Sequence, residues 1–339
     1  MVTKLRVQNF RKHSNFTIDF VDSPNIIIGQ NGSGKTSLVE AIYIALQGKS
    51  WRSTFAEILN NNQDENWWRI DIELSDGEKR TVKFVDGKKE FMVDGKVSAR
   101  LPAKFKKPAL LFEPGDLQLL YGSPSRRRDF IDKLIIQIDP AHATELRKLE
   151  RVLKQRNFLL KNNVSQDDLF VWDVQFADIS EKVINTRIKW VNKINEHLSG
   201  SYNAVAETND DIKISYSITE KSRNQILSQL KDDYTKGYSY TRSGPQAHDV
   251  VFRLNNQLAK TTASRGESRT IIIGAISAMV RIINEELDQK AYLILDDISS
   301  ELDETRLKGI YSPQLFGDNF IFSTAVNTDK NFGFIHNID

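Results

Sequence analysis

The chain has 339 residues, of which 40% are hydrophobic and 27% are charged, and its formal net charge at pH 7 is +2. This composition is typical of a globular protein with two domains, or with one domain that carries a large insertion. Because the net charge is near zero, any nucleic-acid binding must depend on local clusters of basic residues. The absence of cysteine excludes disulfides, zinc–thiolate sites and cysteine nucleophiles, and it is compatible with a cytoplasmic location.

The ends and the apolar runs of the sequence give no sign of a membrane protein. The first residues, MVTKLRVQNFRKH, are charged and lack the apolar stretch of a secretory signal. The longest mostly apolar run, residues 270–280, is too short to cross a bilayer. We therefore expect a soluble intracellular protein without membrane partners.

The N-terminal part of the chain predicts strands and one helix. Residues 4–10 and 16–20 alternate apolar and polar side chains, which predicts β-strands. The apolar run at 25–29 predicts a buried strand, and apolar residues at helical spacing predict a helix over about 35–46. Three Asp-Gly pairs punctuate residues 67–97 and predict a small antiparallel meander.

The middle of the chain has a different character. Glycine is almost absent from 124 to 200, and the apolar residues take helical spacing, which predicts two or three long helices that form an arm. The polar stretch LKNNVSQDD, residues 160–168, predicts the turn between them. We interpret the apolar stripe as core or as a seam between helices, since the arm is too short for a long coiled coil.

The C-terminal part returns to alternating strands and helices. Strands are predicted at 211–218 and 249–256, a helix at about 266–288, a buried strand at 291–297 and a final strand at 319–325. The fold class is therefore α/β, with a parallel core interrupted by a helical insertion. The predicted division is an N-terminal head part at 1–122, a helical arm lobe at 123–234 and a C-terminal head part at 235–339.

Residues 29–36, GQNGSGKT, match the phosphate-binding pattern G-x-x-x-x-G-K-[ST]. Glycines allow backbone N–H groups to approach phosphates, and the following helix adds its positive N-terminal end. Lys35 would contact the β- and γ-phosphates of ATP, and the Thr36 hydroxyl would bind Mg²⁺. The predicted ATP-binding residues of this loop are Gly29, Asn31, Gly32, Ser33, Gly34, Lys35, Thr36 and Ser37. A glycine-rich turn that matches by chance is the alternative, which the strand–loop–helix context disfavours.

An acidic strand end supplies the second half of such a site. The apolar run YLILDD, residues 292–297, ends in two aspartates. Asp296 is predicted to hold Mg²⁺, directly or through water, and Asp297 to orient the attacking water. Lys35 and Asp297 are therefore the predicted catalytic residues.

A third motif lies in TTASRGESRT, residues 261–270, where Ser264 and Gly266 start a predicted helix that could grip phosphate oxygens. Taken alone, this motif is equally well explained as a simple N-cap. The order of motifs, from the P-loop to this helix start, the acidic strand and the segment SELD (300–303), resembles that of the ABC-type ATPases. In that class the Ser-x-Gly element of one subunit closes over the γ-phosphate held by the other.

Five separated segments together resemble the RecF family of bacterial DNA replication and repair proteins. They are NFRKHSNFTIDF…NIIIGQNGSGKTSLVEAIYIALQGKSWR, LLFEPGDLQLLYGSPSRRRDFID, GPQAHDVVFRLNN, ASRGESRT and LILDDISSELD. The resemblance covers nearly the whole chain except the arm at about 140–230. It implies an ABC-type, SMC/Rad50-like ATPase head with a short helical lobe, an ATP-dependent homodimer and weak DNA-stimulated ATPase activity. It also implies binding of duplex DNA near single-strand gaps, work with RecR and RecO in loading RecA, and roles in DNA replication, repair and the SOS response.

Carried over by position, the resemblance assigns Lys35, Thr36, Asp296, Asp297, Ser264 and Gly266 as above. It adds Asp303, as part of the loop that communicates across the dimer, and Arg11, as a basic residue that reaches the nucleotide. Three departures bear on activity. Glu267 and Ser268 stand where the family usually has two glutamines, residues 244–249 lack an arginine, and the last strand offers Ser323 and Thr324 where many ABC ATPases have a histidine. The first two departures bear on the strength of ATP-driven dimerisation and not on nucleotide binding, and with the third we expect slow turnover.

Two basic clusters, Arg126–Arg128 and Lys104 with Lys106 and Lys107, are candidates for DNA contact because such clusters neutralise phosphates. The alternatives are solvated surface and, for the arginines, contacts with nucleotide or with the fold core. Two other functions remain open. One is a DNA scaffold that binds ATP and scarcely hydrolyses it, and the other is an ABC ATPase that serves a different partner.

Overall fold

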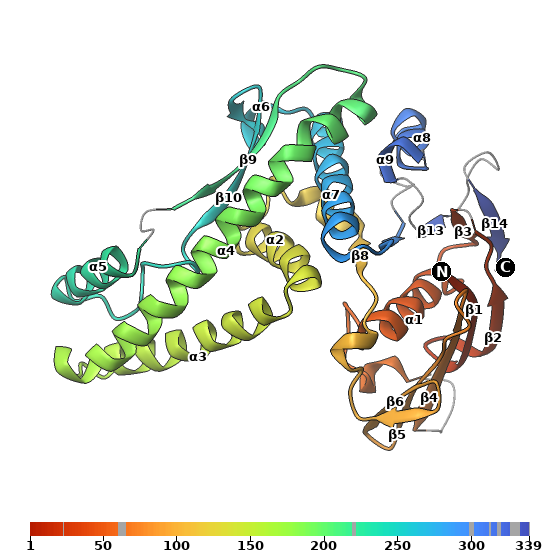
Figure 1. Cartoon of the computed structure of the whole chain (residues 1–339), viewed down its shortest axis with the longest axis horizontal. Coiled ribbons are helices and arrows are strands. Elements are labelled where there is room, and N and C mark those ends of the chain that lie inside the picture. The colour runs from red at the N-terminus through yellow and green to blue at the C-terminus, as the bar shows by residue number, and fades with distance from the viewer. Residues whose placement is uncertain are drawn as a thin grey trace. The chain divides into compact units, whose positions relative to one another are not determined.

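We describe a computed structural model of the chain, which covers residues 1–22, 24–59, 66–218, 222–297, 302–311, 313–316, 320–325 and 333–338. Contacts divide the chain into two compact units, residues 1–117 with 283–339 and residues 118–282 (Figure 1). The first unit brings together the phosphate-binding motif and the acidic strand from the two ends of the sequence, and the second contains the helical lobe and the motif with Ser264 and Gly266. The division into 1–122, 123–234 and 235–339 stays a prediction.

The first unit contains an antiparallel sheet of six strands in the order β2-β1-β4-β5-β6-β7. The strands are β1 (Val2–Phe10), β2 (His13–Asp19), β4 (Trp67–Leu74), β5 (Lys79–Val85), β6 (Lys88–Val93) and β7 (Lys96–Ser98). The predicted meander is confirmed, and its Asp-Gly pairs form the turns. Asp86 and Gly87 have φ values of 47° and 80°, and Asp94 and Gly95 have 46° and 80°. Two consecutive positive φ angles are those of the tight hairpin turns that match the twist of antiparallel strands.

The same unit contains a parallel sheet of five strands in the order β14-β3-β13-β12-β8. The strands are β3 (Asn25–Ile28), β8 (Ala109–Phe112), β12 (Tyr292–Leu295), β13 (Phe320–Ala325) and β14 (Phe334–Asn337). The predicted parallel core is therefore confirmed, while β14 was not predicted. Because all five strands are parallel, the loop after β3 and the acidic end of β12 lie at the same edge of the sheet, on either side of β13.

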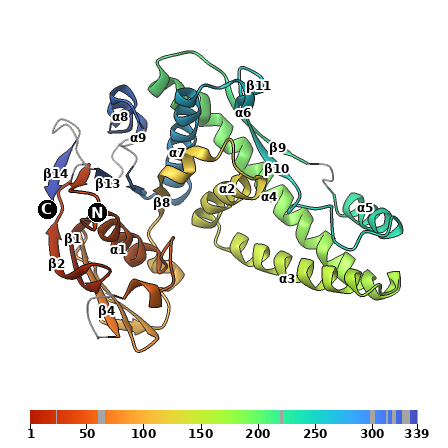
Figure 2. The same cartoon turned by 180° about the vertical axis from the view of Figure 1, so that it is seen from behind.

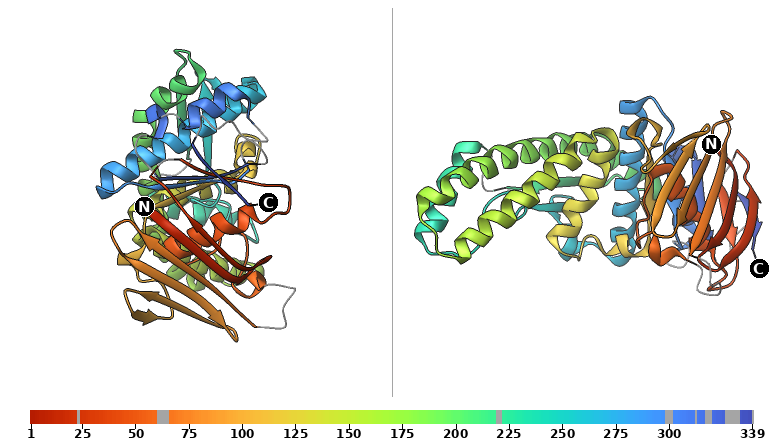
Figure 3. Two further views of the ribbon diagram at one scale, coloured as in Figure 1. Left: turned by 90° about the vertical axis from the view of Figure 1, so that its right-hand side faces the viewer. Right: turned by 90° about the horizontal axis from the view of Figure 1, so that it is seen from below.

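Helix α1 (Lys35–Gln47) lies between the two sheets of the first unit. It contacts β1, β4 and β5 of the antiparallel sheet and β8 and β13 of the parallel sheet (Figure 3). Its Leu38, Ala41, Ile42 and Ala45 have at most 1% of their surface exposed, and they belong to one hydrophobic core shared by both sheets. Burial on two sides explains why almost every side chain of this helix is buried. The phosphate-binding motif thus starts a helix that is buried along almost its whole length.

Shorter helices complete the described part of the first unit. They are the 3₁₀ segments η1 (Ala56–Ile58), η2 (Ala103–Phe105) and η3 (Pro114–Gln118), the last of which ends in the second unit, with α8 (Glu304–Tyr311) and α9 (Pro313–Phe316). Among the described residues, none of the helices of either unit is long and apolar enough to span a membrane.

The second unit is dominated by helices, as the sequence predicted. Its elements are α2 (Pro124–Ile138), α3 (Ala141–Lys161), α4 (Gln166–Ala206), β9 (Ile212–Ser217), α5 (Arg223–Thr235), β10 (Asp249–Leu254), β11 (Gln257–Leu258), α6 (Ala259–Thr262) and the start of α7 (Arg265–Leu287). Helices α3 and α4 pack together, joined by the predicted turn (Figure 2). At a rise of 1.5 Å per residue, α4 is about 60 Å long.

Helix α4 also closes the edge of the small sheet β11-β10-β9. Asn195 accepts a hydrogen bond from the Ile214 N–H (2.8 Å) and donates one to its carbonyl (2.7 Å). Ser199 makes the same pair of bonds with Ile212, each 3.0 Å long. Asn203 repeats it with Asp210, at 3.0 and 3.1 Å. Side chains four residues apart on a helix advance by about 6 Å, close to two residues of a strand, so the helix supplies the hydrogen bonds of a missing strand. This protects the edge of β9 from other chains.

Replacing Asn195 by Ala is expected to lower the free energy of unfolding by about 1–3 kcal/mol, since the Ile214 N–H and carbonyl lose both partners. Asn192→Ala is the matched control, because Asn192 lies on the exposed face of the same helix. Denaturant unfolding of the two variants tests this. Equal stabilities would show that α4 does not substitute for a strand.

Candidate nucleotide-binding site

The loop at residues 29–34 connects β3 to α1 and has the backbone of a phosphate cradle. Gly34 has a φ of 102°, which favours glycine, and a Cβ atom there would lie 2.3 Å from Nε2 of His13. The carbonyl of Gly34 accepts hydrogen bonds from the N–H groups of Ser37 (2.9 Å) and Leu38 (3.2 Å), so the helix begins directly after it. The glycine is therefore required both by its dihedral angle and by the neighbouring histidine.

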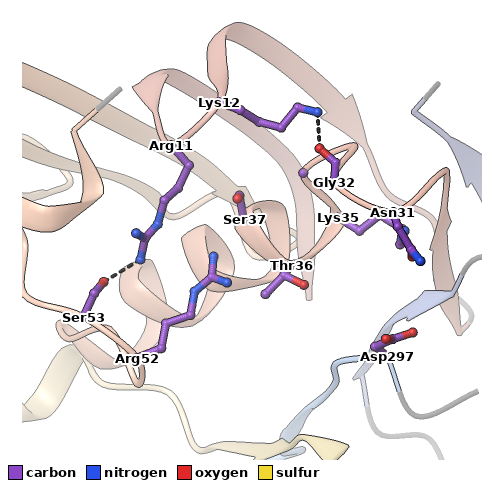
Figure 4. A pocket seen from close by; sticks show the side chains of 11 residues that line it. Arg11, Lys12, Asn31, Gly32, Lys35, Thr36, Ser37, Arg52, Ser53 and Asp297 are labelled. Carbon is purple, nitrogen blue, oxygen red and sulfur yellow. Dashed lines mark hydrogen bonds between the residues drawn. The ribbon is translucent and has the colours of Figure 1, made fainter. Parts of the chain in front are cut away.

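A cavity of about 660 Å³ opens over this loop (Figure 4). Its lining residues are Arg11, Lys12, Asn31, Gly32, Gly34, Lys35, Thr36, Ser37, Arg52, Ser53 and Asp297. The volume is in the range of small-molecule sites. All eleven belong to the first unit, and eight of them were predicted from the sequence. Gly29 and Ser33 belong to the loop without lining the cavity.

Lys35 lies folded against its own loop. Its ammonium group donates to the carbonyls of Gly29 (2.6 Å) and Gln30 (2.9 Å), and 7% of the residue is exposed. Lys12 donates to the carbonyl of Gly32. Two ammonium groups thus stand at the loop where a phosphate would bind, and both cations are held by backbone carbonyls.

The acidic strand end meets the loop directly. Thr36 Oγ1 donates to Oδ1 of Asp296 at 2.8 Å, a contact between residues 260 positions apart in sequence. Thr324, at the end of β13, donates to the same oxygen at 2.9 Å and accepts the Asp297 N–H at 2.8 Å. Hydroxyl and carboxylate oxygens are the ligands that Mg²⁺ prefers, so the side chains of Thr36 and Asp296 fit this ion. Sequence analysis noted Thr324 as a position where many ABC ATPases have a histidine. In this structure its hydroxyl is hydrogen-bonded to both aspartates.

Glu40, a buried carboxylate of α1, holds the basic residues at the other end of the cavity. Arg11 donates to both of its oxygens, at 2.8 and 3.0 Å, and Arg52 donates to Oε2 at 2.7 and 3.0 Å. Burial raises the pKa of Glu40, but hydrogen bonds from Arg11, Arg52 and Ser50 outweigh this and hold the pKa below its usual value. Sequence reasoning predicted Arg11 and missed Lys12, Glu40, Arg52 and Ser53. The one available signal was an acidic residue on a face of a helix that is otherwise apolar.

Ser264, Gly266 and Asp303, which the sequence predicted outside the P-loop and the acidic strand, do not line the cavity. Ser264 and Glu267 cap α7 in the second unit, where the Ser264 N–H donates to the Glu267 carboxylate (2.7 Å) and the Glu267 N–H donates to Ser264 Oγ (3.2 Å). Gly266, also in α7, accepts a hydrogen bond from Thr270 Oγ1 at 3.0 Å. Asp303 accepts the Arg306 N–H at 2.9 Å at the start of α8. The roles of these residues stay predictions.

Two of the three clustered arginines, Arg127 and Arg128, make hydrogen bonds within the second unit. Arg127 is buried and binds both carboxylate oxygens of Asp249, at 2.8 and 2.9 Å. Arg128 donates to the carbonyl of His248 at 2.5 Å. For these two residues the fold-core alternative is confirmed, while Arg126 is exposed. In the other cluster Lys104 and Lys106 are exposed, and Lys107 pairs with Asp76 and Glu78.

We expect His13, which contacts the phosphate-binding loop, to make the stability of the protein depend on pH. Its Nε2 lies 3.2 Å from the Gly34 carbonyl, and burial lowers the pKa of His13 although that carbonyl acts in the opposite direction. A histidine with a lowered folded-state pKa contributes stability that is present above its unfolded pKa of about 6.5 and is lost as pH falls through the folded value. We therefore expect the free energy of unfolding to fall below pH 6.5, and to fall less in His13→Gln. Chemical denaturation at pH 7.5 and 5.5 tests this, and equal pH dependence of the two proteins would contradict it.

The fold and the cavity together define an ATPase head with a P-loop, and the AAA ATPase domain family matches residues 1–328. DNA replication and repair protein RecF of Shewanella sp. (strain MR-4) is 31% identical over 329 residues, which cover 95% of this chain and 91% of that protein. RecF of Clostridium acetobutylicum is 31% identical over 319 residues, covering 90% and 87%. The chain belongs to the RecF family, which confirms the resemblance.

Solved structures agree with this assignment. One described as the recombination mediator protein RecF-ATPrS in the RecFOR pathway has a TM-score of 0.83 at 26% identity, covering 98% of this chain and 93% of that one. An Smc head bound to the C-terminal winged-helix domain of ScpA has a TM-score of 0.55 at 14% identity, over 97% and 90% of the two chains. The second likeness concerns the fold alone. The predicted fold class, an ABC-type head interrupted by a helical lobe, is thereby confirmed.

Proposed function

We propose that this chain binds ATP with Mg²⁺ in the cavity over residues 29–37 and works as a DNA-binding ATPase of replication and recombinational repair. The observation that carries the proposal is the contact between Thr36 and Asp296, which joins the phosphate loop to the acidic strand. The RecF relatives and the solved RecF-ATPrS structure support the same ligand and the same process.

The residues of the P-loop and of the acidic strand end have distinct roles in this proposal. Lys35 and the backbone of Asn31, Gly32, Ser33 and Gly34 bind the phosphates, with Lys35 exchanging its loop carbonyls for phosphate oxygens. Thr36 and Asp296 would hold Mg²⁺, which neutralises charge on the phosphates when it is bound. Asp297 orients the attacking water and accepts its proton.

The second half of the pocket comes, in this proposal, from another copy of the chain. Ser264 and Gly266 at the start of α7 would meet the γ-phosphate held by the partner, and Asp303 would transmit the contact between the copies. ATP then joins two heads, and its hydrolysis separates them. The resemblance to ABC-type ATPases supports this step.

Duplex DNA next to a single-strand gap is the proposed substrate, with RecR and RecO as protein partners. The RecFOR pathway in the description of the solved relative supports these partners. Phosphate release is expected to rise when duplex or gapped DNA is added, with the gapped form acting more strongly. If neither DNA changes the rate or binds the protein in the presence of ATP, the DNA-binding part of the proposal is wrong.

A scaffold that binds ATP and scarcely hydrolyses it is the second candidate. The capping pair of Ser264 and Glu267 favours it, because a carboxylate already occupies the helix start that would face the partner's phosphate. Under this candidate, phosphate release would be equally low in the wild type and in Asp297→Asn.

Glu267→Gln is expected to strengthen the ATP-dependent dimer about fivefold. The substitution removes the negative charge of Glu267, which would repel the partner's phosphates. It also weakens the hydrogen bond between this side chain and the start of α7, and each effect is worth about 0.3–1 kcal/mol. Sedimentation of the dimer over a concentration series measures this, with Glu150→Gln on the exposed face of α3 as the control. A weaker dimer in Glu267→Gln would show that the carboxylate helps to bind the partner.

A further inference from the structure

Glu40 is an unusual residue for the centre of a buried helix. It lies in α1 five positions after Lys35, and none of its surface is exposed. A buried carboxylate is unfavourable unless it is paired and hydrogen-bonded. A leucine or alanine would pack between the two sheets at no such cost, so the charge has a consequence beyond packing.

The carboxylate accepts hydrogen bonds from two guanidinium groups and from two hydroxyl groups, with the Ser53 hydroxyl at 3.4 Å the more distant. Arg11 comes from the turn after β1 and binds one oxygen with Nε and the other with Nη2. Arg52 comes from the segment after α1 and binds Oε2 with Nε and Nη2. Ser50 donates to Oε1 at 2.6 Å. One negative charge is therefore shared by two positive charges, which leaves one net positive charge at this end of the cavity.

The two arginines differ in what remains of their donors. Arg11 also donates to the Glu57 carbonyl (3.0 Å) and to Ser53, so three of its nitrogens are used. Arg52 is bound by Glu40 through Nε and Nη2, and its Cζ lies 6.0 Å from the centre of the Trp51 ring. Its Nη1 has no hydrogen-bond partner among the residues that the structure describes. Arg52 lines the cavity, with 35% of its side chain exposed (Figure 4). Its outer edge is therefore available for an anion.

We propose that Glu40 is a positioning residue for nucleotide binding: it fixes the Arg52 guanidinium with its outer edge toward an anionic group of the nucleotide, and Arg11 braces Glu40 from the other side. The inference rests on the proposed binding of ATP in this cavity. An arginine side chain that is already fixed loses less conformational entropy when the nucleotide binds. This smaller entropic cost increases the affinity for the nucleotide. A single arginine paired with Glu40 would be neutral, and the second arginine restores the attraction for phosphate.

The simpler alternative is that Glu40 only ties α1 to two neighbouring loops. In that case Glu40→Gln would lower the stability of the protein, and its effect on nucleotide affinity would be the same whether or not Arg52 is present. The two accounts differ in the coupling between Glu40 and Arg52, which a double-mutant cycle measures.

The experiment compares the wild type, Glu40→Gln, Arg52→Ala and the double variant of the full chain. A fluorescent ATP analogue with Mg²⁺ gives the Kd, and thermal unfolding without nucleotide gives the stability. We expect each single variant to bind about tenfold more weakly, and the double variant to bind no more weakly than Arg52→Ala alone. If the two losses multiply in the double variant, Glu40 does not act through Arg52 and the inference is overturned.

Glu40→Asp keeps the experiment decisive if the glutamine variant folds poorly. The shorter aspartate keeps the negative charge but places its oxygens farther from the Arg52 guanidinium. We therefore expect a smaller loss of affinity than in Glu40→Gln, and no further loss when Glu40→Asp is combined with Arg52→Ala. Lys35→Ala separates this inference from the proposed function. If the wild type does not bind the analogue more tightly than Lys35→Ala, ATP binding itself is wrong. If it does while the Glu40 and Arg52 losses multiply, the positioning role alone fails.

Discussion

Asp297→Asn is expected to reduce ATP hydrolysis about 100-fold or more while leaving the Kd for ATP within about threefold of the wild type. Asparagine has the same shape as aspartate but cannot accept the proton of the attacking water. The Asp297 N–H bond to Thr324 belongs to the backbone and survives the substitution, so Asp296 and the P-loop keep their arrangement. Loss of turnover without loss of binding is therefore the signature of a catalytic carboxylate.

Phosphate release at saturating ATP, with and without duplex DNA, measures the effect, and binding of a fluorescent ATP analogue measures the Kd. Asp129→Asn, on the exposed face of α2, is the matched control. Equal rates in the wild type and in Asp297→Asn would remove the catalytic role of Asp297 and favour the scaffold that binds ATP.

Lys35→Ala is expected to weaken ATP binding about 100-fold, because each hydrogen bond between charged groups is worth about 1.5–3 kcal/mol. The carbonyls of Gly29 and Gln30, which now accept from the ammonium group, also lose their partner. Part of the effect will therefore appear as a lower unfolding temperature without nucleotide.

Titration calorimetry with Mg²⁺ and a slowly hydrolysed ATP analogue checks this prediction. Lys12→Ala is an informative comparison, since Lys12 also binds a loop carbonyl but follows β1 instead of starting α1. We expect the smaller loss for Lys12→Ala. Unchanged affinity in Lys35→Ala would mean that the ligand does not bind in this loop.

The parts of the site that are short continuous segments could be predicted, because phosphate and metal binding require particular residue types at a fixed spacing along the chain. The motif at 29–36 gave the loop and the start of α1, and the apolar run ending in Asp296 and Asp297 gave a buried strand with its acidic end. The contact between Thr36 and Asp296 followed because parallel strands place their carboxyl ends at one edge.

The parts that depend on tertiary packing could not be predicted. Arg11 and Glu40 are 29 residues apart, and nothing in either segment shows that they share a bidentate pair with Arg52. The three consecutive arginines at 126–128 were a candidate DNA-binding surface, whereas Arg127 is buried and paired with Asp249 of β10. Strand β14 is four residues long and partly exposed, and its short mixed sequence lacks both an apolar run and an alternation.

Static light scattering tests the central claim most directly, namely that ATP joins two copies of this chain. The Asp297→Asn variant, which should retain its ATP, is measured with and without Mg²⁺ and ATP, beside Lys35→Ala. We predict that ATP doubles the mass of the Asp297→Asn protein and leaves the Lys35→Ala protein as single chains. A single-chain mass for Asp297→Asn at saturating ATP, with binding of the nucleotide verified in the same sample, would contradict the account.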